Sequence, residues 1–197
     1  MLTSFRFSQG PRMSTPRTRP RVVLVGPMGA GKTTVGELLA QRWHTTVRDT
    51  DRDVEAVAGK EIAEIFIDDG EERFRLLERA AVSEALASHT GVLALGGGAV
   101  LDPATREALT EHRVVFLQVG LSDAVKRVGL GVGRPLLLGN VRSRIKVLLD
   151  ERIPVYRSVA MLAVETDGRS ADEVAAEVAR RVEDAERAEP VGSGGPA

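Results

Sequence analysis

The sequence has no cysteine in its 197 residues, which excludes disulfide bonds and thiolate zinc sites. Its three histidines are too scattered along the chain to predict a histidine-based metal centre. No apolar run approaches the ~20 residues that a membrane-spanning helix requires. A net charge of −1 leaves no excess of cations, which argues against a general nucleic-acid-binding protein. The 43% of apolar residues suffice for the core of one globular domain.

Lysine is scarce as well, with four residues against 23 arginines, so each lysine is informative. Residues 1–20 contain no acidic residue but several arginines and three prolines. This composition predicts a disordered leader. The alternatives are an organelle transit peptide or a translation start at Met13. Residues 186–197 are rich in proline, glycine and serine and predict a disordered tail. One ordered domain is therefore expected over residues 21–185.

Five short apolar runs predict β-strands, at residues 21–25, 46–50, 91–95, 113–119 and 161–165. Segments with helical spacing separate them, and on one of these Phe74, Leu77, Ala81 and Ala85 form a single stripe. The strands are rich in valine and leucine rather than alternating, which is typical of strands covered on both faces. The sequence therefore predicts an α/β fold, a parallel sheet of about five strands with helices on both faces.

The segment GPMGAGKT, residues 26–33, matches the pattern G-x-x-x-x-G-K-[ST] directly between a predicted strand and a predicted helix. In this motif the backbone N–H groups of the loop and the N-terminal end of the helix bind phosphate. Lys32 reaches the β- and γ-phosphates, and the Thr33 hydroxyl can ligate Mg²⁺. The motif predicts that the chain binds a nucleoside triphosphate. It does not predict which reaction follows, since motors, switches and kinases share the motif.

The segment RDTDRD, residues 48–53, places Asp49 and Asp51 two positions apart at the end of the second strand. They share a face if the strand continues, whereas a turn splays them. Beside a triphosphate, one carboxylate could hold Mg²⁺ and the other could bind a hydroxyl and accept its proton. The alternative is a solvated turn with Asp53 as the helix cap.

Three further features each allow two interpretations. Arg75 and Glu78 lie three positions apart on one helix face. They form either a surface ion pair or a site in which Glu78 orients the Arg75 guanidinium to bind a substrate carboxylate. The glycine triplet of LALGGGAV, residues 96–98, follows a predicted strand, at the edge of the sheet where ligands bind in such folds. The triplet either lets a ligand approach the backbone closely or forms a tight turn at the end of the strand. Between the fourth and fifth predicted strands, several glycines precede Arg134. This segment is either a surface loop or a mobile lid that carries the Arg134 guanidinium into the site when it closes.

Taken in order, GPMGAGKTTVGELLA, DTD, IAEIFIDDGEERFRLLE, LALGGGAV, GRPLL and ERIPVYRSVA resemble the shikimate kinase family over about residues 21–185. This resemblance implies a three-layer P-loop kinase fold of the nucleoside-monophosphate-kinase type. It also implies a substrate-binding helical segment at about residues 49–78 and a mobile lid at about residues 128–142. The implied reaction is the ATP-dependent phosphorylation of the 3-hydroxyl of shikimate on the route to chorismate and the aromatic amino acids.

The resemblance also implies roles for individual residues. The ATP phosphates would be bound by Gly29, Ala30, Gly31, Lys32, Thr33 and Thr34. Thr33 would ligate Mg²⁺ directly and Asp49 through water, while Arg127 and Arg169 would flank the adenine. Arg134 would move onto the transferring phosphoryl group. The substrate would be bound by Asp51, Arg75, Gly97, Gly98 and Arg152, with the arginines on its carboxylate and Asp51 on its hydroxyls. Asp51 is the favoured base, although in a loose transition state it could chiefly orient the hydroxyl.

The resemblance further implies a cytoplasmic monomer. The nearest alternative is another small-molecule kinase, such as a gluconate kinase, and the arginine pair together with DTD argues against it. A switch or an ATPase that binds a partner protein would need an aspartate after an apolar strand, and none follows the predicted strand 113–119 before Asp123. One departure from the family pattern is Arg48, which stands where a buried strand would have an apolar residue; this strand is therefore expected to be short or at an edge.

Overall fold

The computed structural model describes residues 19–129 and 141–188 and contains all five predicted strands in one parallel sheet. The strands are β1 (Val22–Val25), β2 (Val47–Asp49), β3 (Val92–Ala94), β4 (Val114–Gln118) and β5 (Leu162–Glu165). Their order is β2-β3-β1-β4-β5, with β1 in the centre. Since the strand order reverses beside β1, the carboxyl ends of β1 and β3 mark the expected ligand site.

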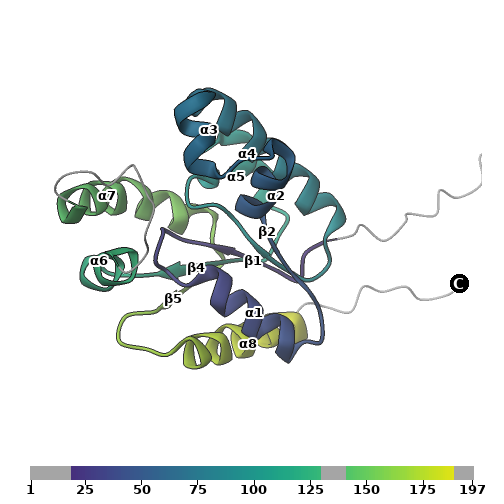
Figure 1. Cartoon of the computed structure of the whole chain (residues 1–197). Helices are drawn as coiled ribbons and strands as arrows, with labels where there is room; N and C mark the ends of the chain where they lie inside the picture. The colour runs from purple at the N-terminus through teal and green to yellow at the C-terminus, as the bar shows by residue number, and fades with distance from the viewer. Residues whose placement is uncertain (1–18, 130–140, 189–197) are drawn as a thin grey trace, which may run out of the picture.

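Helices cover both faces of this sheet (Figure 1). They are α1 (Lys32–Arg42), α2 (Thr50–Ala58), α3 (Ile62–Asp68), α4 (Gly70–Ser88), the short 3₁₀ helix η1 (Ala99–Leu101), α5 (Pro103–Leu109), α6 (Leu121–Gly129), α7 (Val141–Val159) and α8 (Ala171–Ala188). Helices α1 and α8 lie together on one face, and α2 to α5 lie on the other. The α/β fold with doubly covered strands is therefore confirmed. Helix α8 continues beyond residue 185, where the sequence suggested that the domain ends.

The continuous apolar runs are explained by two cores, one on each face of the sheet. Leu24 of β1 packs with Leu39 and Val178 beneath α1 and α8. Val23, its neighbour in the chain, packs with Phe116 of β4 on the opposite side. Successive side chains of a strand point to opposite faces, so a strand buried on both sides has no position for a polar residue.

A third, smaller cluster joins α2, α3 and α4. Val54, Ile65 and Phe74 contribute one buried side chain from each helix. Of the expected stripe on α4, Phe74 and Ala85 are buried, whereas Leu77 and Ala81 are only partly buried. This cluster holds the helical segment 49–78 as a unit above the carboxyl edge of the sheet.

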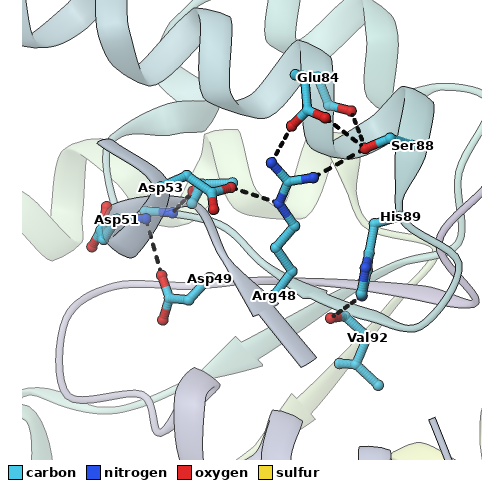
Figure 2. A network of polar contacts seen from close by, with 10 residues as sticks. Arg48, Asp49, Asp51, Asp53, Glu84, Ser88, His89 and Val92 are labelled. Atoms are coloured by element: carbon cyan, nitrogen blue, oxygen red, sulfur yellow. Dashed lines mark hydrogen bonds and ion pairs between the residues drawn. The ribbon is translucent and has the colours of Figure 1, made fainter. Parts of the chain in front are cut away.

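Arg48 explains how a charged residue fits into β2. The strand is only three residues long and lies at the edge of the sheet, as its sequence predicted. The Arg48 guanidinium donates from Nε to Asp53 of α2 at 2.7 Å and also binds Glu84 and Ser88 of α4 (Figure 2). Because these partners come from two helices, Arg48 ties α2 to α4 beside the strand.

Several expectations fall on residues that the structure does not describe. Residues 1–18, residues 189–197, most of the expected lid and Arg134 within it lie outside the described ranges. Within those ranges, no helix combines the length and the apolar character needed to cross a bilayer.

Candidate active site

The predicted phosphate loop connects β1 to α1. Gly26, Gly29 and Gly31 have positive φ angles of 151°, 81° and 90°, and an added Cβ at Gly26 would lie within 3.0 Å of the carbonyl oxygen of Leu117. Such backbone favours glycine and turns the loop back on itself. The Lys32 ammonium donates to the carbonyl oxygens of Gly26 at 2.8 Å and of Pro27 at 3.2 Å. The loop therefore wraps around its own lysine at the N-terminal end of α1, an arrangement suited to phosphate.

Thr33 lies in the first turn of α1 and faces the end of β2. Its Oγ1 donates to Oδ2 of Asp49 at 3.0 Å. Two oxygen ligands side by side fit Mg²⁺, which binds proteins through few direct ligands and keeps water or phosphate oxygens in its remaining positions. The described residues contain no group of three or more carboxylates and histidines that could hold a metal by itself.

Asp49 is both the last residue of β2 and the N-cap of α2. Its Oδ1 accepts a hydrogen bond from the backbone N–H of Asp51 at 3.0 Å (Figure 2). The chain thus turns from strand to helix between the two carboxylates, so the turn and not the continuing strand sets their directions. The alternative with Asp53 as the cap is wrong, because Asp53 lies within α2 and binds Arg48.

The glycine triplet follows β3, and its first member faces the acidic side chains. A Cβ at Gly96 would lie inside 3.0 Å of Oδ1 of Asp51 and 3.0 Å from Oε1 of Glu78. The Gly96 N–H donates to Oγ1 of Thr50 at 3.0 Å, which fixes the start of α2 to this turn. Gly96 is thus needed because two carboxylates of the protein itself fill the place of a side chain.

The third glycine faces Arg75. A Cβ at Gly98 would lie inside 3.0 Å of Nη1 of the Arg75 guanidinium. The same Nη1 donates to Glu78 at 2.6 Å, and Nη2 donates to Glu71 at 3.1 Å. Glu78 is only 3% exposed, so the pair is not the surface ion pair of the first interpretation. Two carboxylates from α4 and a glycine together orient this guanidinium.

The middle glycine faces α7 with its carbonyl group. Arg152 donates from Nη1 to the Gly97 oxygen at 3.3 Å, and the Tyr156 hydroxyl donates to the same oxygen at 2.5 Å. A Cβ at Gly97 would meet nothing closer than 3.6 Å. Among the described residues, neither Gly97 nor Gly98 donates its N–H to an acceptor. Two backbone donors are therefore available at this strand exit.

The electrostatics of this cluster set the protonation of Asp51. Burial, helped by the charge of Asp49, raises the pKa of the Asp51 carboxyl to about 6, against the opposing effect of Lys32. Burial likewise raises the pKa of Glu78, although Arg75 counteracts it. At neutral pH Asp51 is thus largely ionised yet a stronger base than an ordinary aspartate.

Arg127 contacts the segment between β5 and α8, and Arg169 belongs to this segment. Arg127 of α6 donates to the carbonyl oxygen of Gly29 at 3.2 Å and to that of Thr166, after β5, at 2.8 Å. It therefore joins the phosphate loop to the segment that follows β5. Arg169 pairs with Glu177 of α8 at 2.6 Å, which directs its guanidinium toward that helix rather than toward the loop.

The sequence reasoning did not single out Tyr156. Its signals in the sequence were its scarcity, since this is the one tyrosine of the chain, and its place in the segment ERIPVYRSVA. The structure buries it completely against Phe116, with ring centroids 5.1 Å apart. Otherwise the structure gathers the predicted Lys32, Asp51 and Arg152, with most other described residues of the two binding sets, around the ends of β1, β2 and β3. The exceptions are Arg127, which lies toward the segment after β5, and Arg169, which pairs with α8.

This sheet edge presents a phosphate loop to oriented arginines and a basic carboxylate, which defines the protein class as a P-loop kinase of small molecules. The family model described as Shikimate kinase matches residues 28–183. The chain belongs to the shikimate kinase family.

Comparison with individual proteins agrees with this family. A curated shikimate kinase from Salinispora arenicola is 62% identical over 160 residues, covering 81% of this chain and 96% of that protein. The structure of a shikimate kinase from Acinetobacter baumannii in complex with shikimate has a TM-score of 0.81 at 35% identity, covering 85% of this chain and 94% of that one. A gluconokinase from Sinorhizobium meliloti, at 22% identity and a TM-score of 0.52, shares the fold alone.

Proposed function

We propose that this chain transfers the γ-phosphoryl group of ATP to the 3-hydroxyl of shikimate, giving shikimate 3-phosphate and ADP. The observation that carries the proposal is the glycine turn after β3. This turn brings Asp51, Arg75 and Arg152 together at the sheet edge that also holds the phosphate loop. Family membership and the shikimate bound to the Acinetobacter baumannii relative support the same substrate. The reaction is a step toward chorismate and the aromatic amino acids.

On the nucleotide side, the phosphate loop binds the triphosphate through its backbone N–H groups and Lys32. The backbone of Gly29 to Gly31, together with Thr33 and Thr34, completes this contact. Arg127, next to Gly29, flanks the adenine, and Arg134 neutralises the transferring group. Arg169 pairs with Glu177 of α8 and is not assigned to the adenine. Thr33 would hold Mg²⁺ directly and Asp49 through water, and the metal would supply neutralisation of charge on the phosphate oxygens.

On the acceptor side, Arg75 and Arg152 bind the carboxylate of shikimate, and the N–H groups of Gly97 and Gly98 contact its oxygens. Asp51 accepts a hydrogen bond from the 3-hydroxyl and so orients this oxygen toward the phosphorus atom. The hydroxyl oxygen forms the new bond to phosphorus as the bond to the bridging oxygen of ADP breaks. The proton of the hydroxyl passes to the Asp51 carboxylate.

The test is release of ADP by the purified chain, measured with shikimate, with gluconate and with other hydroxy acids. Turnover should require shikimate and should be lost in Lys32→Met and Asp51→Asn. Arg75→Ala should chiefly raise the KM for shikimate, by roughly 10- to 100-fold, because a charged hydrogen-bonding pair contributes about 1.5–3 kcal/mol. Turnover that depends on gluconate and not on shikimate would refute the assignment. We further propose that the enzyme acts as a cytoplasmic monomer, which family membership supports.

A further inference from the structure

Tyr156 connects the core to the glycine turn. It lies in α7 with no exposed surface, and its ring stacks on Phe116 of the neighbouring strand β4. A phenylalanine would fill the same space, so packing alone does not require the hydroxyl. Burial raises the pKa of the Tyr156 phenol to about 12, so the group remains protonated and donates its hydrogen bond to Gly97.

The peptide unit between Gly97 and Gly98 transmits this contact. A trans peptide is planar, and its C=O and N–H groups point in opposite directions. Holding the Gly97 carbonyl toward α7 therefore directs the Gly98 N–H away from α7. Glycines have more backbone freedom than other residues, so two in succession need such a restraint to keep one orientation. The Gly98 N–H has no acceptor among the described residues, which leaves it available to a ligand.

The same carbonyl also anchors Arg152, which precedes Tyr156 by one helical turn. Arg152 reaches the Gly97 oxygen at 3.3 Å, whereas the Tyr156 hydroxyl reaches it at 2.5 Å. The Tyr156 contact is the stronger restraint, because it lies within the usual O–H···O range of about 2.5–3.0 Å, whereas the Arg152 contact is longer than the usual N–H···O range of about 2.7–3.2 Å. One backbone oxygen thus sets the relative placement of a guanidinium and of a free N–H group.

We propose that Tyr156 is a positioning residue for the acceptor substrate: its hydroxyl fixes the Gly97–Gly98 peptide so that the Gly98 N–H and Arg152 together meet oxygens of shikimate. This inference rests on the proposed function. Tyr156 itself touches neither substrate. Its effect should appear in the binding of the acceptor and not in that of the nucleotide.

The experiment compares Tyr156→Phe with Ser158→Ala, each in the full chain. Both remove a hydroxyl from α7, but Ser158 only bonds the carbonyl oxygen of Val155 within the helix, at 2.8 Å. In Tyr156→Phe the KM for shikimate should rise about three- to tenfold, as expected for a lost hydrogen bond, while the KM for ATP stays within twofold. Ser158→Ala should leave both constants unchanged. An unchanged KM for shikimate, or equal rises in both constants with a lowered Tm, would overturn the proposal.

A second measurement separates this inference from the proposed function. In ¹⁵N–¹H spectra of the ligand-free protein, Tyr156→Phe should shift or broaden the Gly98 amide signal and leave that of Gly168, in the loop after β5, in place. A Gly98 signal identical to that of the wild type would overturn the positioning role. A wild-type chain that does not phosphorylate shikimate would overturn the proposed function, and the spectra would still decide whether Tyr156 orients the peptide.

Discussion

Replacing Asp51 with asparagine should stabilise the protein while abolishing its turnover. The side chain is partly buried beside Asp49 and Glu78, which disfavours its charged form and raises the pKa of Asp51 from its ordinary value of 3.8 to about 6. The folded chain therefore bears a carboxylate in a place that opposes its charge. Asparagine keeps nearly the same shape without the charge, so the cost of folding around the carboxylate disappears.

The size of this effect follows from the pKa. A rise of about two pKa units, at about 1.4 kcal/mol for each unit, corresponds to about 3 kcal/mol. Asp51 is only partly buried, and solvent screens part of this penalty. The expected gain in the free energy of unfolding is therefore about 1–3 kcal/mol at pH 7.5. For a domain of this size, the gain raises the Tm by roughly 2–12 °C.

The pH dependence has a definite sign. Because the pKa of Asp51 is higher in the folded than in the unfolded state, the folded chain binds this proton more tightly. The stability of the wild type relative to Asp51→Asn should therefore be greatest below pH 4 and should fall as the pH rises through 6. The advantage of the variant should be full at pH 7.5 and should vanish near pH 4.

The assay is urea unfolding followed by the fluorescence of Trp43, the only tryptophan, whose Nε1 donates to Glu183 of α8 at 2.9 Å. Nucleotide and divalent metal are left out, because bound cations would favour the ionised form of Asp51. The matched control is Asp53→Asn, which removes a carboxylate that pairs with Arg48 and should not stabilise the fold. If Asp51→Asn were no more stable than the wild type at pH 7.5, or if its advantage did not change with pH, the reasoning would be refuted.

Three further changes test other parts of the site. Gly97→Ala should keep the Tm within about 3 °C, because its Cβ would meet no atom closer than 3.6 Å; a larger loss in thermal melts would contradict this. Gly98→Ala should displace the Arg75 guanidinium and raise the KM for shikimate at least about tenfold in the ADP-release assay, as expected when a charged hydrogen bond of about 1.5 kcal/mol is lost; an unchanged KM would show that Arg75 does not bind the acceptor. Arg48→Leu should lower the free energy of unfolding by about 1–2 kcal/mol, less at high salt, and an equal loss at low and high salt would exclude its ion pairs as the cause.

The parts of the site that are contiguous in sequence could be predicted from sequence. The phosphate loop follows one strand and begins one helix, so its residue types, spacing and context suffice to place Lys32 and Thr33. The edge position of β2 was also predictable, because the charge of Arg48 does not fit a strand covered on both faces.

Contacts between distant segments could not be predicted in this way. The crowding of Gly96 by Asp51, and of Gly98 by Arg75, depends on how α2 and α4 pack above the end of β3. The sequence suggested that a ligand approaches these glycines, whereas side chains of the protein itself fill the places beside two of them. Likewise, the pairing of Arg75 with Glu78 was visible as a spacing, but the burial of Glu78 follows only from the tertiary structure.

The short outer strands have a consequence for behaviour at high protein concentration. Strands β2 and β5 form the two borders of the sheet, with three and four residues respectively. Charged side chains lie along both: Arg48 is on β2 and Glu165 is on β5. In addition, Arg181 of α8 donates to the carbonyl oxygen of Ala163 in β5 at 3.3 Å. Another polypeptide would find few open backbone groups on which to add a further strand, so the borders protect the fold against intermolecular sheet growth and aggregation.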